Sequence, residues 1–198
     1  MSDTSVATGE KSPDKEFNGV NLTDIENLVS AIGQDPNLAQ VQFQARSVWR
    51  GGTQAECHIG PMMAGGNDIR PETNRYTLIV DEPKVLGGKD EYPNPVEYIA
   101  AALCGCITAG IATNAALFGT ELTKIEVDVD VNFDIHGVLG LNRDVPSGPL
   151  DLHYRVKLAG PGAREAMMKS KSTIDRKSPI RNSIELPLRV TTDVEIEE

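Results

Sequence analysis

The chain has 198 residues, 39% of them hydrophobic, and its 29 acidic residues outnumber 19 basic ones to give a formal charge of −10. A chain of this length can form one domain with a substantial core. The acidic balance argues against a nucleic-acid partner or an anionic membrane, because binding phosphate groups needs a basic surface. Three cysteines cannot all pair within the chain, which favours a reducing cytoplasm over a secreted disulfide framework.

The N-terminal region divides into a tail and a helix. Residues 1–18 lack the apolar core of a secretory signal and are rich in small polar residues, so we expect a disordered tail. Residues 19–36 are expected to be a helical extension, because apolar residues recur at helical spacing from 21 to 32. Asn21 and Thr23 are the candidate N-caps of this helix.

Alternation of apolar and polar residues predicts the strands of the remaining domain, 37–198. Five runs are predicted to be strands: residues 41–49, 75–80, 125–133, 150–158 and 184–196. Residues 57–73, rich in Gly, Pro, Met and Asn, are predicted to be a loop, and Pro161 opens a predicted helix over 161–177. Hairpin-like neighbours, without regular strand-helix-strand crossovers, indicate an α+β fold.

One uncharged segment is long enough to cross a membrane. Residues 99–118 consist mostly of Ala, Gly, Thr and Cys, which is a weak membrane signal, so we predict a buried helix of a soluble protein and no membrane contact. Asn94, Pro95 and Glu97 predict the start of this helix, as N-cap, first residue and partner in a capping box. Gly119 marks its predicted end.

Four segments resemble the OsmC/Ohr superfamily. The first, NPVEYIAAALCGC, resembles its central-helix signature, in which Asn-Pro, an acidic residue and small residues lead into a Gly-Cys or Ala-Cys pair. DEPKVLGGKDEYPNP upstream, and DVDVNFDIHGVLGL and SPIRNSIELPLRVTTDVEI downstream, resemble the family in the same order, over about 40–198. The resemblance implies an OsmC-like fold, with antiparallel sheets around a long buried central helix. It also implies an intertwined homodimer with its active sites at the subunit interface.

The resemblance further implies a thiol-dependent peroxidase that reduces organic hydroperoxides. In the family a helix cysteine attacks the hydroperoxide and becomes a sulfenic acid, and Cys106 occupies that position by its spacing from the Asn-Pro pair. The thiolate is the reactive form, and a cysteine so far inside a helix gains little from the helix dipole, so a nearby cation is needed. The family uses an arginine of the early hairpin. Arg50 is the first candidate, Arg46 the second and Arg181 a third.

Two positions depart from the family. Its functional carboxylate follows the proline directly, where this chain has Val96. Glu97 comes next and projects, at about 100° per residue, from the helix face opposite Cys106, so it is either catalytic or only a capping residue. The family's resolving cysteine precedes a proline after the second helix. Ser178 stands there in this chain, and a serine cannot form a disulfide.

The sequence leaves open how an oxidised Cys106 would be reduced. Cys104 points about 200° away on the same helix and could bridge to Cys106 only if the helix unwound. Cys57, in the hairpin region, is a substitute if the fold brings it near. Otherwise a one-cysteine cycle would use an external thiol, dithiol or lipoyl group.

Two classes of function remain open. The first is the peroxidase, with an organic hydroperoxide as substrate. The second is a non-catalytic OsmC-like protein that binds a hydrophobic small molecule or senses oxidants, with Cys106 as an inert small residue of a packed helix. No cofactor or metal is expected, because Cys57-His58 has no second ligand pair and His136 and His153 fall on separate elements.

Overall fold

The structure is a computed structural model that describes residues 15–197, apart from the side chain of Asn74. The expected tail therefore lies mostly outside the described residues, as positions 1–14. Its last residues differ from the prediction, because β1 (Glu16–Phe17) pairs with β2 (Val20–Asn21) in a small antiparallel hairpin.

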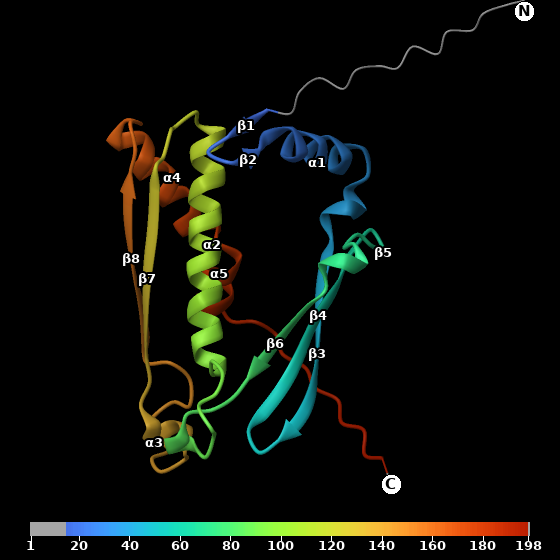
Figure 1. Cartoon of the computed structure of the whole chain (residues 1–198), viewed down its shortest axis with the longest axis vertical. Helices are drawn as coiled ribbons and strands as arrows, with labels where there is room; N and C mark the ends of the chain where they lie inside the picture. The colour runs from blue at the N-terminus through green and yellow to red at the C-terminus, as the bar shows by residue number, and fades with distance from the viewer. Residues whose placement is uncertain (1–14, 198) are drawn as a thin grey trace, which may run out of the picture.

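The predicted N-terminal helix is confirmed as α1 (Leu22–Gln34). Asn21 is its N-cap, and its side chain accepts a hydrogen bond of 3.2 Å from the backbone N–H of Asp24. Asn18, in the turn between β1 and β2, donates to the carbonyl oxygen of Thr120 at 2.9 Å. The N-terminal hairpin is thereby tied to the end of the central helix, with α1 leading away from it (Figure 1).

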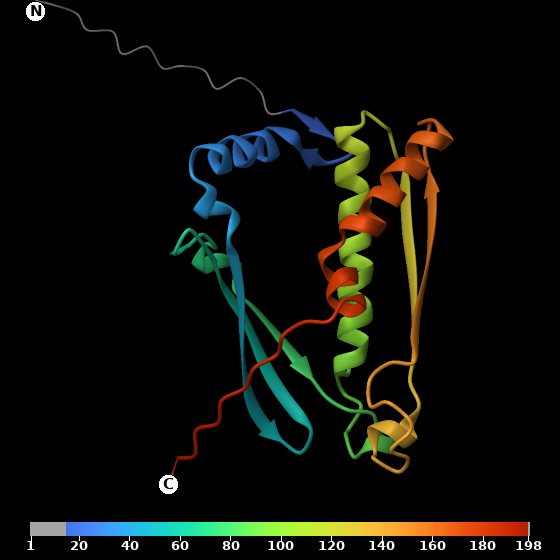
Figure 2. The same cartoon turned by 180° about the vertical axis from the view of Figure 1, so that it is seen from behind.

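A separate four-stranded sheet, called the arm below, follows α1. The arm contains β3 (Val41–Gly51), β4 (Gln54–Ala64), β5 (Asn67–Asp68) and β6 (Tyr76–Val80). β4 pairs antiparallel with each of the other three strands. Both opposite views show the arm standing apart from the central helix α2 (Figures 1 and 2). Short 3-10 helices flank these strands at Pro36–Ala39, Glu72–Asn74 and Lys84–Leu86.

The predicted loop over 57–73 is wrong for its first half, because β4 continues to Ala64. Pairing on both sides, with β3 and β6, supplies backbone hydrogen bonds that outweigh the weak strand propensity of Gly, Pro and Met. Pro61 has no N–H to donate, and the β3–β4 register shifts between Phe43 and Ala45, opposite Gly60-Pro61. An irregularity of this kind is where an antiparallel sheet accepts a proline.

The rest of the chain, called the body below, surrounds the central helix. It contains α2 (Pro95–Leu117), β7 (Lys124–Asn132), α3 (Ile135–Val138), β8 (Asp151–Ala159), α4 (Arg164–Lys177) and α5 (Pro179–Glu185). β7 and β8 form an antiparallel pair on one side of α2, and α4 crosses α2 on another (Figure 2). The fold is α+β, as predicted, with antiparallel sheets and a long central helix.

The core of the body forms where α2 meets α4 and the β7–β8 pair. Leu103, Ile107 and Ile111 are completely buried on one face of α2, at the helical spacing of four residues. Ile174 of α4 packs against them, together with the inward-facing apolar side chains of both strands. Gly110 permits this contact, because a Cβ there would lie 2.1 Å from Cδ1 of Ile174.

The predicted limits of α2 are confirmed at both ends. Asn94 and Glu97 form the capping box, Pro95 is the first helical residue, and the helix ends at Leu117 before Gly119. Among the described helices, α2 alone has the length and composition that a membrane span needs. It packs against β7 and α4, and 28% of its most apolar 18-residue window is buried, so within one chain it is less buried than the prediction of a buried helix implied.

The predicted C-terminal strand over 184–196 is wrong. α5 occupies its first residues, and within the described chain the following residues, 186–197, pair with no strand and run away from the body (Figure 2). The alternating apolar side chains of residues 186–197 are exposed: Leu186, Leu188, Val190, Val194 and Ile196. A strand needs the edge of a neighbouring sheet, so correct alternation alone does not form one. The predicted helix over 161–177 starts later, at Arg164.

Candidate functional site

The candidate site centres on Cys106, about halfway along α2. Its side chain is partly buried, and its Sγ lies 3.1 Å from Oγ of Ser178. Ser178 is completely buried, with a relative exposure of 0%. The fold therefore brings the residue before Pro179 to Cys106, over 72 positions of sequence.

Ser178 is held where α4 ends and α5 begins. Its backbone N–H donates to the carbonyl oxygen of Ile174 at 2.7 Å, which closes the last turn of α4. Its Oγ accepts a hydrogen bond of 3.1 Å from the backbone N–H of Arg181, which caps α5, and Pro179 suits the first position of that helix. The local sequence Ser-Pro thus fixes the turn that presents the hydroxyl to Cys106.

Cys104 points elsewhere, as its position on the helix predicted. Its Sγ lies 3.5 Å from the carbonyl oxygen of Val127 in β7. Burial, and then the nearby carboxylate of Asp128, raise the pKa of Cys104, so this thiol stays protonated and unreactive at neutral pH. Cys57 lies on β4 in the arm, which stands apart from α2 (Figure 1). All three cysteines are free thiols.

Glu97 has the capping role that the sequence left as one of two alternatives. Its carboxylate accepts a 2.8 Å hydrogen bond from the backbone N–H of Asn94, and its own N–H donates to Oδ1 of Asn94 at 2.9 Å. It lies at the first turn of α2, roughly two and a half turns from Cys106. Its carboxylate is engaged in the helix start, and its catalytic assignment gains no contact from this geometry.

The three candidate arginines lie in different places. Arg50 is at the end of β3 and pairs with Glu56, with 3.6 Å between Nη1 and Oε2, while Arg46 lies earlier in the same strand. Both arginines lie on β3 of the arm, and within one chain the arm stands apart from α2 (Figures 1 and 2). Arg181 is close through its backbone, but its guanidinium points to the carbonyl oxygen of Asp175 and to Glu185.

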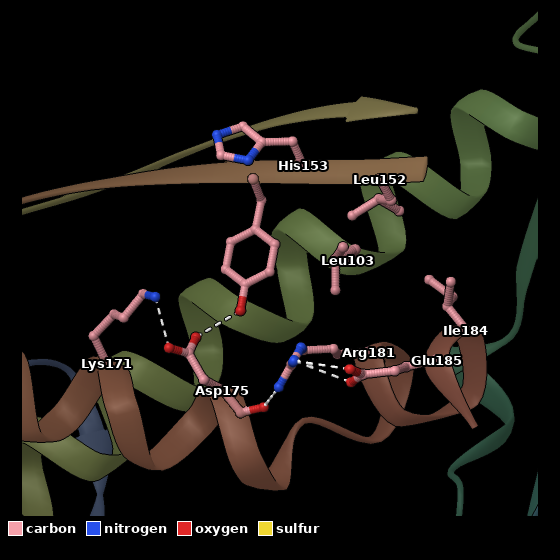
Figure 3. Close-up of a pocket in the computed structure, with 9 residues that line it drawn as sticks. Leu103, Leu152, His153, Lys171, Asp175, Arg181, Ile184 and Glu185 are labelled. Atoms are coloured by element: carbon pink, nitrogen blue, oxygen red, sulfur yellow. Dashed lines mark hydrogen bonds and ion pairs between the residues drawn. The ribbon is translucent and has the colours of Figure 1, made fainter. Parts of the chain in front are cut away.

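A pocket of about 500 Å³ lies next to this turn, between β8, α4 and α5 (Figure 3). The Tyr154 hydroxyl donates to Asp175 at 2.6 Å, and Lys171 donates to the other carboxylate oxygen at 2.6 Å. Burial and the hydrogen bond to Asp175 raise the pKa of Tyr154 to about 12, so the phenol remains a donor. Arg181 and Glu185 complete the polar wall.

This network was missed by the sequence reasoning, although two signals could have found it. Tyr154 occupies an inward-facing position in an otherwise aliphatic alternation, and a buried phenol usually has a hydrogen-bond partner. Asp175 lies near the C-terminus of a helix, where an acidic residue is unfavourable without a neighbouring donor. The polar groups satisfy one another, so the network fastens α4 and α5 to β8.

Side chains that could bind a metal do not cluster in the described part of the chain. Among residues 15–197, no group of three or more His, Cys, Asp or Glu side chains lies in a metal-binding arrangement. His58 pairs with Glu56 on the arm, and His136 pairs with Asp134 beside α3.

The sequence profile of the OsmC-like protein family matches residues 88–193. The match covers more than half of the chain and includes α2, Cys106 and Ser178, so the chain belongs to the OsmC-like family. The arm and Arg50 precede the matched segment. No curated protein matches the chain.

Solved structures share the fold of this chain. An OsmC-like protein from Mycoplasma pneumoniae superposes with a TM-score of 0.56 at 11% identity, over 73% of this chain and 88% of that one. A putative osmotic stress induced and detoxification response protein from Psychrobacter arcticus gives 0.53 at 15%, over 73% and 89%. An OsmC-like protein of unknown function from Vibrio cholerae gives 0.52 at 14%, over 73% and 94%. At these identities the likeness concerns the fold.

Proposed function

We propose that the chain is a thiol-dependent peroxidase that reduces organic hydroperoxides, with Cys106 as its nucleophile. The observation that supports it is the position of the Cys106 thiol, which is partly accessible on the central helix of the OsmC-like fold and contacts a buried hydroxyl. A reactive cysteine needs both access and polar stabilisation of its thiolate. Cys104, by contrast, is turned toward β7.

The chemistry balances without a cofactor. The Cys106 thiolate attacks one oxygen of the hydroperoxide, the O–O bond breaks, and the alkoxide leaves as an alcohol after taking a proton. The product is a sulfenic acid on Cys106. One external thiol then displaces water to form a mixed disulfide, and a second thiol releases Cys106 and the oxidised reductant. A dithiol or a dihydrolipoyl group can supply both thiols.

The proposed enzyme is a homodimer in which the partner completes the site. Phe43 and Trp49 on the arm are 70% and 76% exposed, and Ile99 and Leu117 on α2 are also exposed. Apolar surface of this extent on two separate faces is characteristic of an interface. If the arm of one protomer covers α2 of the other, Arg50 of the partner is the candidate cation for the Cys106 thiolate.

Consumption of cumene hydroperoxide tests the activity directly. With dihydrolipoamide as reductant, the wild type should consume cumene hydroperoxide faster than hydrogen peroxide, because the proposed substrates are organic hydroperoxides. Consumption no faster than in the absence of protein, with every thiol, dithiol and lipoyl reductant tried, would overturn the proposal. We further propose a cytoplasmic location, with no nucleic-acid partner and no membrane contact.

A second candidate function is a non-catalytic OsmC-like protein that binds a hydrophobic small molecule. A pocket of about 680 Å³ between β8 and α4 favours it, because Val156, Leu158, Met167 and Met168 line the pocket. Methionines adapt to varied apolar ligands. Binding of a fluorescent fatty acid without any oxidation of Cys106 by hydroperoxide would select this alternative.

A further inference from the structure

The hydroxyl of Ser178 occupies an unusual position for a helix N-cap. It is sealed from solvent, with a relative exposure of 0%, and it lies 3.1 Å from a partly accessible thiol. A hydroxyl has one hydrogen to donate and two lone pairs to accept with. Counting the hydrogen-bond partners of the Ser178 hydroxyl therefore shows toward which atom its hydrogen points.

One lone pair of Ser178 Oγ is already used. The backbone N–H of Arg181 donates to it at 3.1 Å. This N–H belongs to the first turn of α5, which is anchored because the Arg181 guanidinium donates to the Asp175 carbonyl oxygen and pairs with Glu185 at 3.0 Å (Figure 3). An N–H cannot accept, so the hydroxyl hydrogen must find its acceptor elsewhere.

Within residues 15–197, Sγ of Cys106 is the one other hydrogen-bond partner of this hydroxyl. When Cys106 is a neutral thiol, either atom can donate. When it is a thiolate, only the hydroxyl can, and a hydrogen bond to an ionised acceptor is roughly twice as strong as a neutral one. The buried hydroxyl therefore gains more from the thiolate than from the thiol.

We propose that Ser178 is a hydrogen-bond donor that stabilises the thiolate of Cys106, and that it makes Cys106 a one-cysteine site whose sulfenic acid is reduced from outside. The first part needs only the contacts above, and the second rests on the proposed peroxidase function. Because Ser178 supplies a hydroxyl where a thiol would close a disulfide, oxidised Cys106 stays open to an external thiol, dithiol or dihydrolipoyl group.

Alkylation of Cys106 by iodoacetamide tests the inference without any peroxide. We would measure its rate against pH in a Cys57→Ala, Cys104→Ala background, comparing Ser178 with Ser178→Gly and Ser178→Thr. Glycine is a tolerated N-cap, so it removes the hydroxyl at little cost to α5. Threonine keeps the hydroxyl. Ser170→Ala is the matched control, because Ser170 is equally buried on α4 and its hydroxyl bonds to the Ala166 carbonyl oxygen.

The expected signature is a crossing of two pH profiles. Losing the hydrogen bond should reduce the thiolate fraction of Cys106 about tenfold at about pH 6. The remaining thiolate is more basic and should be about threefold more nucleophilic. The net expectation is that Ser178→Gly reacts with iodoacetamide about threefold more slowly than the wild type at this pH. At about pH 10 the same variant should react about threefold faster, because the more basic thiolate is the better nucleophile. Ser178→Thr should restore the wild-type profile, and Ser170→Ala should leave it unchanged.

Either of two results would overturn the inference. Identical profiles for Ser178 and Ser178→Gly would show that the hydroxyl does not act on the thiolate. Rates that change in one direction at every pH would indicate altered access to Cys106 instead. Measuring the consumption of cumene hydroperoxide by the same proteins tests the proposed function separately. Crossing profiles without consumption would refute the peroxidase and retain the hydrogen bond. Consumption without crossing profiles would refute the role of Ser178.

Discussion

The body and the arm bury their apolar side chains to different extents. In the body, Leu103, Ile107 and Ile111 of α2 are completely buried by residues of the same chain. In the arm, Phe43 and Trp49 are 70% and 76% exposed. The core of the body is thus packed within one chain, whereas the arm leaves large apolar side chains exposed, where the second copy of the proposed dimer would cover them. The candidate nucleophile lies on the body and the favoured arginine on the arm.

The largest expected effect concerns the two cysteines of the body. Cys106→Ser should abolish hydroperoxide reduction, because serine is a far weaker nucleophile than a thiolate. Cys104→Ser should retain most of the activity, since its side chain points to β7. Steady-state consumption of cumene hydroperoxide measures both. Equal loss in the two variants would contradict the assignment of Cys106 from its face of α2.

A second variant tests whether the body alone holds the geometry of the site. In Ser178→Cys, the new sulfur replaces an oxygen 3.1 Å from Cys106 Sγ, and a shift of about 1 Å gives disulfide geometry. One equivalent of cumene hydroperoxide should then give an intrachain disulfide between positions 106 and 178, detected by peptide mass spectrometry. Ser170→Cys is the control that should give none. Failure to form the bond would show that the two residues are not adjacent in solution.

Stability should respond differently in the two regions. Ile107→Ala should lower the free energy of unfolding by about 2–5 kcal/mol, because it leaves a cavity in the core of the body. Phe43→Ala should cost little within one chain and should instead weaken the dimer. Urea unfolding over a range of protein concentrations, with light scattering, separates the effects. A large, concentration-independent loss in Phe43→Ala would remove the distinction between body and arm.

Arg50→Ala tests whether the arm of one protomer serves the body of the other. Losing a charge-assisted contact with the thiolate should slow reaction with hydroperoxide about tenfold. Arg46→Ala is the comparison. Mixing Arg50→Ala protomers with Cys106→Ser protomers should restore activity in the heterodimers, because one of their two sites then combines an intact Cys106 with an intact Arg50. Unchanged rates in both Arg50→Ala and Arg46→Ala would leave Arg181 as the remaining candidate of the three.

The smallest effect concerns the junction between arm and body. Asp81 is completely buried after β6 and accepts hydrogen bonds from Thr53, Gln54 and three backbone N–H groups. Burial acts to raise its pKa, but these hydrogen bonds outweigh burial and hold the pKa of Asp81 well below its usual range. Its stabilising effect is therefore present above the ordinary carboxyl pKa and is lost as the pH falls toward the lowered value.

Asp81→Asn should lower the melting temperature at neutral pH. As the pH is lowered, the melting temperature of this variant should fall less than that of the wild type. Thermal unfolding followed by circular dichroism between neutral and acidic pH measures both changes. Asp193→Asn, at an exposed position of the C-terminal segment, should change neither. A melting curve of Asp81→Asn that declines in acid as steeply as the wild type would contradict the account of this junction.

The sequence predicted the local features of the fold well. The caps of α1 and α2 and the strands β7 and β8 follow from patterns within a few residues, and the structure confirms them. β4 was missed because pairing with two neighbours overrides the composition of Gly60-Pro61. The C-terminal strand was wrong for the opposite reason, since alternation without a neighbouring edge does not form a strand.

The candidate site was predictable in identity but not in contacts. The resemblance placed Ser178 at the resolving position, yet only the fold shows its hydroxyl against Cys106 and the N–H of Arg181 against that hydroxyl. The hydrogen bond between Tyr154 and Asp175 joins two elements that no local pattern relates. The place of Arg50 in the site stays a prediction, because it depends on a second chain.

Trapping of the oxidised thiol tests the central claim most directly. The wild type would receive one equivalent of cumene hydroperoxide with dimedone present, and the peptide containing Cys106 would be sequenced by mass spectrometry. The account predicts a dimedone adduct on Cys106, none on Cys104, and loss of the peroxide in equal amount. An unmodified Cys106 with the peroxide unconsumed would contradict it.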